Sequence, residues 1–180
     1  MGRVRVATVW FGGCSGCHMS FLDMDEFLVD LADMVDIVYS PVADIKEYPE
    51  NVDLCLVEGA VANDEHLELA HIIRERTKTV VAFGDCAISG NVTAMRNPAG
   101  AVEPILQKIY VEAATLHGRI PFEKGIVPTL LDRVMPLHEA IKVDAFLPGC
   151  PPPASRIRAM LEKALAGEPL VLEGRELKPG

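Results

Sequence analysis

Short apolar runs alternate with amphipathic segments along the whole chain. Runs rich in Val, Ile, Leu and Phe lie at residues 3–9, 35–40, 52–59, 79–84 and, more weakly, 143–149. Most of them are nearly continuous rather than alternating in polarity, which is typical of strands that are covered on both faces. The pattern therefore predicts five buried strands.

The segments between these runs have helical features. They lie at residues 19–35, 64–78, 101–113 and 151–167. The segment at 64–78 follows Asn63, a favourable N-cap residue, and the last segment begins with prolines and ends at Gly167. Both arrangements are typical of helix boundaries.

Strands that alternate with helices predict a parallel sheet wrapped on both sides, in a flavodoxin-like, doubly wound α/β fold. The chain has 180 residues, of which 49% are hydrophobic, so we expect a single domain over residues 1–180. Residues 112–142 depart from the pattern, because prolines and glycines interrupt them. We expect an irregular excursion there, and such excursions are usually functional or cover a neighbour.

Charge and composition narrow the class of function. The net charge is −9 and no cluster of Lys and Arg could neutralise phosphates, so nucleic acid is not an expected partner. No apolar stretch approaches the ~20 residues that cross a bilayer, so we expect a cytoplasmic protein without a membrane span. The five cysteines are an odd, scattered set, which does not fit a secreted disulfide framework.

Four of these cysteines directly follow predicted strands. Cys14 and Cys17 lie in the turn GGCSGC after the first strand, whereas Cys86 follows the fourth strand and Cys150 the fifth. The carboxyl ends of parallel strands meet at the edge where open α/β sheets hold their sites. We therefore expect three loops to converge there, while Cys55, in the middle of the third strand, is interpreted as a small buried hydrophobe.

The turn around the first pair suits a site ligated by sulfur. Gly13, Ser15 and Gly16 would place backbone N–H groups around the bound group, and the N-terminus of the following helix favours negative charge. Four thiolates can bind either zinc or a 4Fe–4S cluster. Structural zinc sites usually use two C-x2-C pairs to staple a small domain, whereas this chain has one pair and a large predicted core.

Two further chemistries fit parts of the turn. A thioredoxin-like dithiol would use Cys14 and Cys17 and would leave Cys86 and Cys150 unexplained. FMN could bind at the same turn of a flavodoxin-like fold, but such loops are rich in Ser and Thr and this one offers only Ser15. No dinucleotide or Walker motif supports nucleotide binding by this chain.

Four motifs in order carry a family resemblance: WFGGCSGCHMSFLD, VEGAV, FGDCAISGN and MPLHEAIKVDAFLPGCPPP. Together they resemble the small subunit of nickel-iron hydrogenases, most closely the short cytoplasmic small subunit of the NAD-reducing, bidirectional type. The resemblance implies that Cys14, Cys17, Cys86 and Cys150 ligate one proximal 4Fe–4S cluster. The related subunit of respiratory complex I has adjacent cysteines at the first site, whereas Ser15 and Gly16 separate them here.

The resemblance also implies partners. These are a large subunit that carries the nickel-iron centre, and iron-sulfur and flavin diaphorase subunits that lead to NAD. Larger members of the family carry a second, cysteine-rich domain with two more clusters, whereas no cysteine follows Cys150 here. We therefore expect electrons to leave this chain for another subunit.

Three further features concern the surroundings of the site. Glu58 ends the third strand at the same edge. The family's EG motif implies that it is a polar residue near the cluster and the proton path. The alternative is that Glu58 is a solvated loop carboxylate or a helix cap. His18 could contact cluster sulfide or cap the turn. The apolar band of segment 19–35 is wider than one core face needs. We expect part of it to pack on the large subunit together with loops 10–18 and 86–97.

Overall fold

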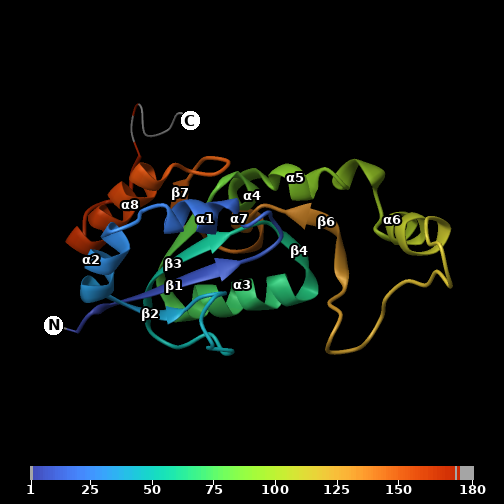
Figure 1. The fold of residues 1–180 in the computed structure, drawn as a ribbon, viewed down its shortest axis with the longest axis horizontal. Helices are drawn as coiled ribbons and strands as arrows, with labels where there is room; N and C mark the ends of the chain where they lie inside the picture. Colours follow the sequence, from blue (N-terminus) through green and yellow to red (C-terminus); the bar gives the residue numbers. More distant parts are fainter. Residues whose placement is uncertain (1, 173, 175–180) are drawn as a thin grey trace.

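A five-stranded parallel sheet forms the centre of the protein (Figure 1). The computed structural model describes residues 2–172 and 174. The strands are β1 (Val4–Trp10), β2 (Val35–Tyr39), β3 (Val52–Glu58), β5 (Thr77–Phe83) and β7 (Ala145–Leu147). Their order, β2-β1-β3-β5-β7, is the flavodoxin-like order of doubly wound sheets. The five predicted strands and the predicted fold class are confirmed.

Helices cover both faces of this sheet, because alternate residues of each strand point to opposite sides. Leu54 and Leu56 of β3 belong to one apolar core, and Cys55 and Val57 belong to the other. The first core is covered by α1 (Gly16–Leu22), α2 (Phe27–Met34) and α8 (Ala154–Ala166). The second is covered by α3 (Asp64–Arg76), α4 (Asp85–Ser89) and α7 (Leu137–Ala140).

The helix predicted over 19–35 is two helices. A turn at residues 23–26 separates α1 from α2, and Asp25 adopts a left-handed conformation with φ +50°. Met24 and Phe27 on either side of Asp25 are both buried. The prediction of one continuous helix was wrong because the break allows both side chains to reach the core.

One strand of a second, two-stranded antiparallel sheet lies inside the stretch that was predicted to be irregular. The sheet pairs β4 (Val61–Asn63) with β6 (Leu130–Met135). The expected excursion over 112–142 is therefore too long, since only about residues 113–129 lack a helix or strand. Prolines at 128 and 136 flank β6 without entering it, so the strand can keep its backbone hydrogen bonds.

The remaining elements lead away from the sheet and back. They are α5 (Asn91–Ala94), the 3-10 helix η1 (Asn97–Ala99), α6 (Glu103–Gln107) and the π-helix η2 (Lys108–Glu112). Residues 103–128, which we call the arm, project beyond the carboxyl edge of the sheet (Figure 1). No helix in the described part of the chain has the length and hydrophobicity needed to cross a membrane.

Candidate metal centre

The three cysteine-bearing loops are joined to one another at the carboxyl edge of the sheet. Ser20 of α1 donates a hydrogen bond from Oγ to the carbonyl oxygen of Pro152, at 2.6 Å. Asp85 accepts from the backbone N–H of Gly149 at 2.8 Å, and its own N–H donates to the Gly149 carbonyl at 2.9 Å. These bonds link the loop that holds Cys150 to both of the other cysteine loops.

The four thiols interact electrostatically. Burial raises the pKa of Cys17 far above its ordinary range, and the charges of Glu58, Cys86, Cys14 and Cys150 raise it further. Burial, Cys14 and Cys150 likewise raise the pKa of Cys86. Four thiolates can share this edge at neutral pH only if a positive group compensates their charge, as metal binding does.

Glycines leave room for the sulfur atoms. A Cβ at Gly84, where φ is +82°, would lie 2.2 Å from Sγ of Cys17, so no side chain fits there. A Cβ at Gly16 would lie 3.3 Å from Sγ of Cys14, and one at Gly13 would lie 3.9 Å from Sγ of Cys86. Ser15, the remaining residue singled out from the turn, has a left-handed backbone with φ +70° and precedes the first turn of α1.

Gly84 was not identified from the sequence. The motif FGDCA contained a clue to its role. Gly84 directly follows a strand there and lies two residues before the candidate ligand Cys86. Sequence reasoning could find a tight turn there. It could not find the approach of Cys17, which belongs to a loop 67 positions earlier.

Glu58 is almost fully buried, with 1% of its surface exposed. Its two carboxylate oxygens accept hydrogen bonds from the backbone N–H groups of Cys17, at 3.3 Å, and His18, at 3.0 Å. The interpretation of Glu58 as a solvated loop carboxylate is therefore wrong, whereas the alternative of a cap is right. A side chain from β3 satisfies the free N–H groups in the first turn of α1.

His18 lies beside Glu58 and is also buried. Its Nδ1 contacts the Glu58 carboxylate, and its ring stacks on Trp10 with centroids 5.3 Å apart. Its Nε2 is buried without a hydrogen-bond partner among the described residues. The ring therefore pairs with Glu58 instead of capping the turn.

Cys55 is separate from this group, as expected. It is fully buried within β3, and burial raises its pKa to about 12. Within the described residues, no group of three or more His, Cys, Asp or Glu is placed to hold a single metal ion. A tetrahedral zinc site would require its sulfur atoms about 3.8 Å apart, whereas each thiolate of a 4Fe–4S cluster binds a different iron. As placed in the described structure, the four cysteines therefore do not form a compact site for a single ion.

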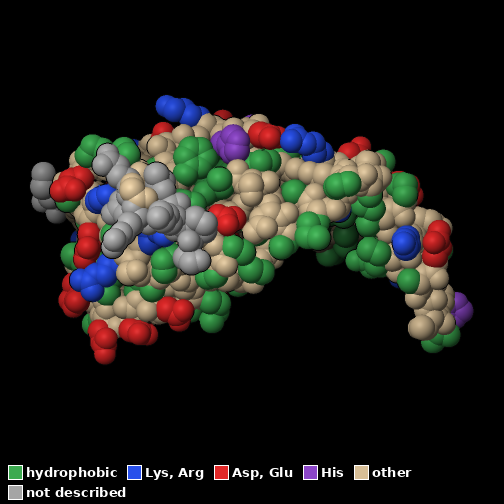
Figure 2. All heavy atoms as spheres, turned by 90° about the horizontal axis from the view of Figure 1, so that it is seen from above, with side chains coloured by type: hydrophobic (Ala, Val, Ile, Leu, Met, Phe, Trp, Pro, Cys, Tyr) green, Lys and Arg blue, Asp and Glu red, His purple; other side chains and the backbone are tan. Residues whose placement is uncertain are grey.

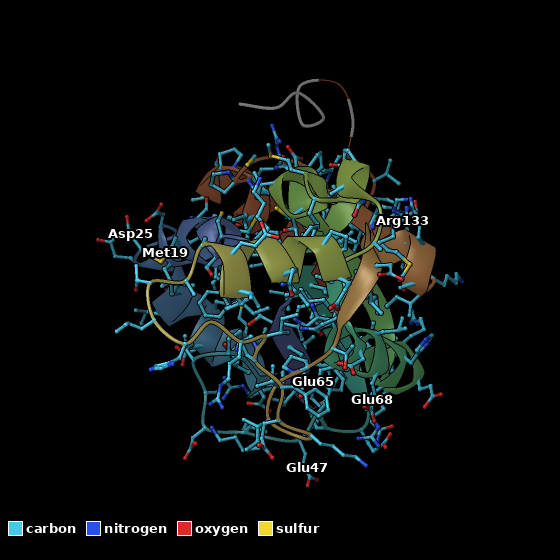
Figure 3. All side chains as sticks on the ribbon, turned by 90° about the vertical axis from the view of Figure 1, so that its right-hand side faces the viewer. Met19, Asp25, Glu47, Glu65, Glu68 and Arg133 are labelled. Atoms are coloured by element: carbon cyan, nitrogen blue, oxygen red, sulfur yellow. The ribbon has the colours of Figure 1, made fainter. Side chains whose placement is uncertain are left out.

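Apolar side chains are exposed on α1 and on segments next to the cysteine loops in the sequence. We call this set the apolar rim; it consists of Trp10, Met19, Leu22, Val92 and Met95. Figure 3 shows Met19 projecting from α1 at the edge of the molecule. All five lie in the segments for which the sequence predicted contact with another subunit.

Comparison with known proteins identifies the family. Residues 14–164 match the family model described as NADH ubiquinone oxidoreductase, 20 Kd subunit. The NAD-reducing hydrogenase HoxS subunit delta of Cupriavidus necator is 38% identical over 95% of this chain and 83% of its own length. A subunit of the F420-non-reducing hydrogenase vhu of Methanocaldococcus jannaschii is 40% identical over 92% of this chain, which spans 57% of that relative.

Solved structures agree with this assignment. A chain of an NAD+-reducing NiFe hydrogenase in the H2-reduced state is 38% identical and superposes with a TM-score of 0.93 over 99% of this chain and all of that one. A NiFeSe hydrogenase from Dm. baculatum, 17% identical with a TM-score of 0.62 over 99% of this chain and 70% of its own, shares the fold. The chain therefore belongs to the NADH ubiquinone oxidoreductase 20 kDa subunit family, and its resemblance to hydrogenase small subunits of the NAD-reducing type is confirmed.

Proposed function

We propose that this chain is the electron-transfer small subunit of an NAD-linked nickel-iron hydrogenase, and that Cys14, Cys17, Cys86 and Cys150 hold one proximal 4Fe–4S cluster. The observation that carries the proposal is the joining of the three cysteine-bearing loops at one sheet edge, with Gly84 leaving space against Cys17. When bound, such a cluster supplies one-electron redox chemistry. The names of the hydrogenase relatives support the same function.

The chain's own residues would hold the site in distinct ways. Cys17 and Cys86 are buried, so the inner side of the site is shielded from water, whereas Cys14 and Cys150 are exposed. Asn91 donates from Nδ2 to Sγ of Cys150 at 3.3 Å, and such hydrogen bonds to sulfur tune a cluster's potential. Gly13, Ser15 and Gly16 form the backbone of the turn.

Glu58 acts in this proposal as a positioning residue. Its carboxylate fixes the backbone of Cys17 and His18, and with them the direction from which α1 presents Cys17. If Glu58 also took part in proton transfer, protons would need a route from its carboxylate to the large subunit. The contact between Glu58 and His18 could be the first step of that route. Both roles would reduce hydrogen turnover if the carboxylate were lost.

The resemblance to hydrogenase small subunits implies the partner subunits of this chain. A large subunit would carry the nickel-iron centre, and iron-sulfur and flavin diaphorase subunits would take the electrons to NAD. We assign no FMN to this chain, because its turn is occupied by cysteines and offers a single hydroxyl, Ser15. We further propose that residues 1–180 form a single domain, since both cores share the same sheet.

Substitution of individual cysteines separates this proposal from its alternatives. Cys86→Ser and Cys150→Ser should each lose iron and acid-labile sulfide, whereas the matched control Cys55→Ala should keep both. Iron, zinc and sulfide would be measured on the complex purified anaerobically. A thioredoxin-like dithiol enzyme would keep its activity in both serine variants, and a zinc module with four cysteine ligands would contain zinc and no sulfide, so either result would overturn the proposal.

A further inference from the structure

The arm is firmly anchored at its base, and among the described residues it makes no hydrogen bond to the body along its length. At the base, Arg96 donates to the carbonyl oxygens of Ala62 and Leu131, at 3.2 and 2.6 Å. Thr129 and Asp64 exchange two hydrogen bonds, at 2.9 and 3.0 Å. Between these anchors, every hydrogen bond that the described structure gives residues 103–128 is local. Two of these bonds run to the carbonyl oxygen of Val102, just before the arm. The arm is thus held out from the body at a fixed root.

Large apolar side chains are exposed along the arm. Leu116, Phe122 and Ile126 expose 80%, 79% and 75% of their surfaces. The arm also contains an apolar groove of about 420 Å³, lined by residues that include Leu106, Tyr110, Phe122, Val127 and Leu130. Exposed apolar surface of this extent, on a segment that projects from its own domain, marks a binding site for another molecule.

The charge of the arm differs from that of the whole chain. Three acidic and three basic residues lie within 103–128 and cancel, although the chain carries a net charge of −9. A segment without net charge does not select a strongly charged partner, and its exposed apolar side chains suit burial against another protein. The arm therefore suits an apolar protein surface rather than a basic one.

The apolar rim beside the cysteines continues toward the arm. Val92 and Met95 belong to the rim, and Met95 immediately precedes Arg96 at the root of the arm. Hydrophobic side chains line the hollow between the body and the arm (Figure 2). The arm bends toward the side on which Met19 projects from α1 (Figures 2 and 3). Val92 and Met95 of the rim thus lie next to the root of the arm in the sequence, after the loop that carries Cys86.

We propose that the arm clasps the nickel-iron large subunit, whose apolar segment enters the groove between α6–η2 and residues 120–130. This inference rests on the proposed function, which directs the cysteine edge toward that subunit. The exposed apolar side chains of the arm and its groove support it, because the arm leaves the body beside the loops that carry the cysteines. The arm would thereby align the cluster edge with the partner.

The test uses the complete complex, purified through a tag on the large subunit. Phe122→Ser and Ile126→Ser would be made singly and together, with Val42→Ser as the control, since Val42 is 81% exposed in a loop outside the arm. The double variant should bind the large subunit about 10-fold more weakly or worse on dilution. The control should match wild type, and every variant should keep its iron and sulfide.

The outcomes distinguish the two proposals. If the wild-type chain carries no iron or binds no large subunit, the proposed function itself fails. If wild type assembles and the arm variants assemble equally well, only the clasp is overturned. Variants that keep the large subunit but lose a diaphorase subunit or a second copy of this chain would overturn the choice of partner.

Discussion

Individual residues at the sheet edge act mainly by leaving space or by fixing the backbone. Gly84 is the clearest example, because its missing side chain makes room for the sulfur of a cysteine far away in sequence. Glu58 is the counterpart, a buried carboxylate whose bonds go to backbone N–H groups next to a proposed ligand. A buried carboxylate is costly unless its oxygens are satisfied, so both residues are tied to the position of Cys17.

Replacing Gly84 tests this dependence on space. Gly84→Ala should abolish or strongly reduce iron binding, because the new Cβ would overlap the Cys17 sulfur. Gly100→Ala is the matched control: its φ of +81° imposes a similar strain of about 1–3 kcal/mol, but nothing lies within 4 Å of its Cβ. Equal iron and sulfide content in the two purified variants would contradict the assigned role of Gly84.

Glu58→Gln tests the role of the buried carboxylate. The amide can accept from only one of the two N–H groups, so we expect the free energy of unfolding to fall by about 1–3 kcal/mol. Hydrogen turnover should fall while iron and sulfide content stay unchanged. Turnover would be assayed with an artificial dye as well as with NAD, and unchanged rates in both assays would remove Glu58 from the functional site.

The residues of the site differ in how far sequence could reveal them. The four cysteines were found because each directly follows a strand, and the sheet topology alone then gathers them at one edge. The contact between Glu58 and His18 and the role of Gly84 were not found. They depend on how α1 packs over β3 and β5, which local patterns do not encode.

Among the secondary-structure elements, those with strong local signals formed as predicted. Helix α3 starts where expected, with Asn63 Oδ1 accepting from the His66 N–H at 2.8 Å. The break between α1 and α2 and the strand β6 were missed. The break satisfies core packing on both sides of Asp25, and β6 exists because β4 pairs with it, so neither could be predicted from its own residues.

The stability that the start of α3 contributes to the fold is expected to depend on pH. Burial lowers the pKa of His66, whose Nδ1 accepts a hydrogen bond from the Ala62 N–H at 3.3 Å. Because the unfolded chain binds this proton more readily, the stabilising contribution is present above about pH 6.5 and is lost as pH falls below it. His66→Phe, which can still stack on Phe11, should therefore lose less stability than wild type on acidification.

Chemical denaturation at roughly pH 7.5 and 5.5 measures this difference. The quantity to compare is the change in the free energy of unfolding between the two pH values, for wild type and for the variant. The absolute values cannot be compared, since the substitution itself changes the stability. His71→Phe provides a control for removal of a histidine on the same helix. Identical slopes for wild type and His66→Phe would show that His66 does not titrate abnormally in the folded protein.

The whole molecule is a sheet with one functional edge and a projecting arm. Two separate cores stabilise the sheet from both faces, so the loops at its carboxyl edge can be devoted to the cysteines. The arm extends beyond the same edge (Figure 1). The five-stranded architecture and the helical start of the arm, α6 and η2, followed from the sequence pattern. The course of residues 113–128 did not, because these residues form no helix or strand whose periodicity could reveal it.

The measurement that tests the central claim most directly is electron paramagnetic resonance of the complex, purified anaerobically, before and after addition of hydrogen. Metal and sulfide analysis of this subunit would accompany it. The account predicts about four iron and four sulfide per chain, with a signal that changes on exposure to hydrogen and disappears in Cys86→Ser. Zinc in place of iron, or a metal-free chain with a redox-active Cys14–Cys17 pair, would contradict it.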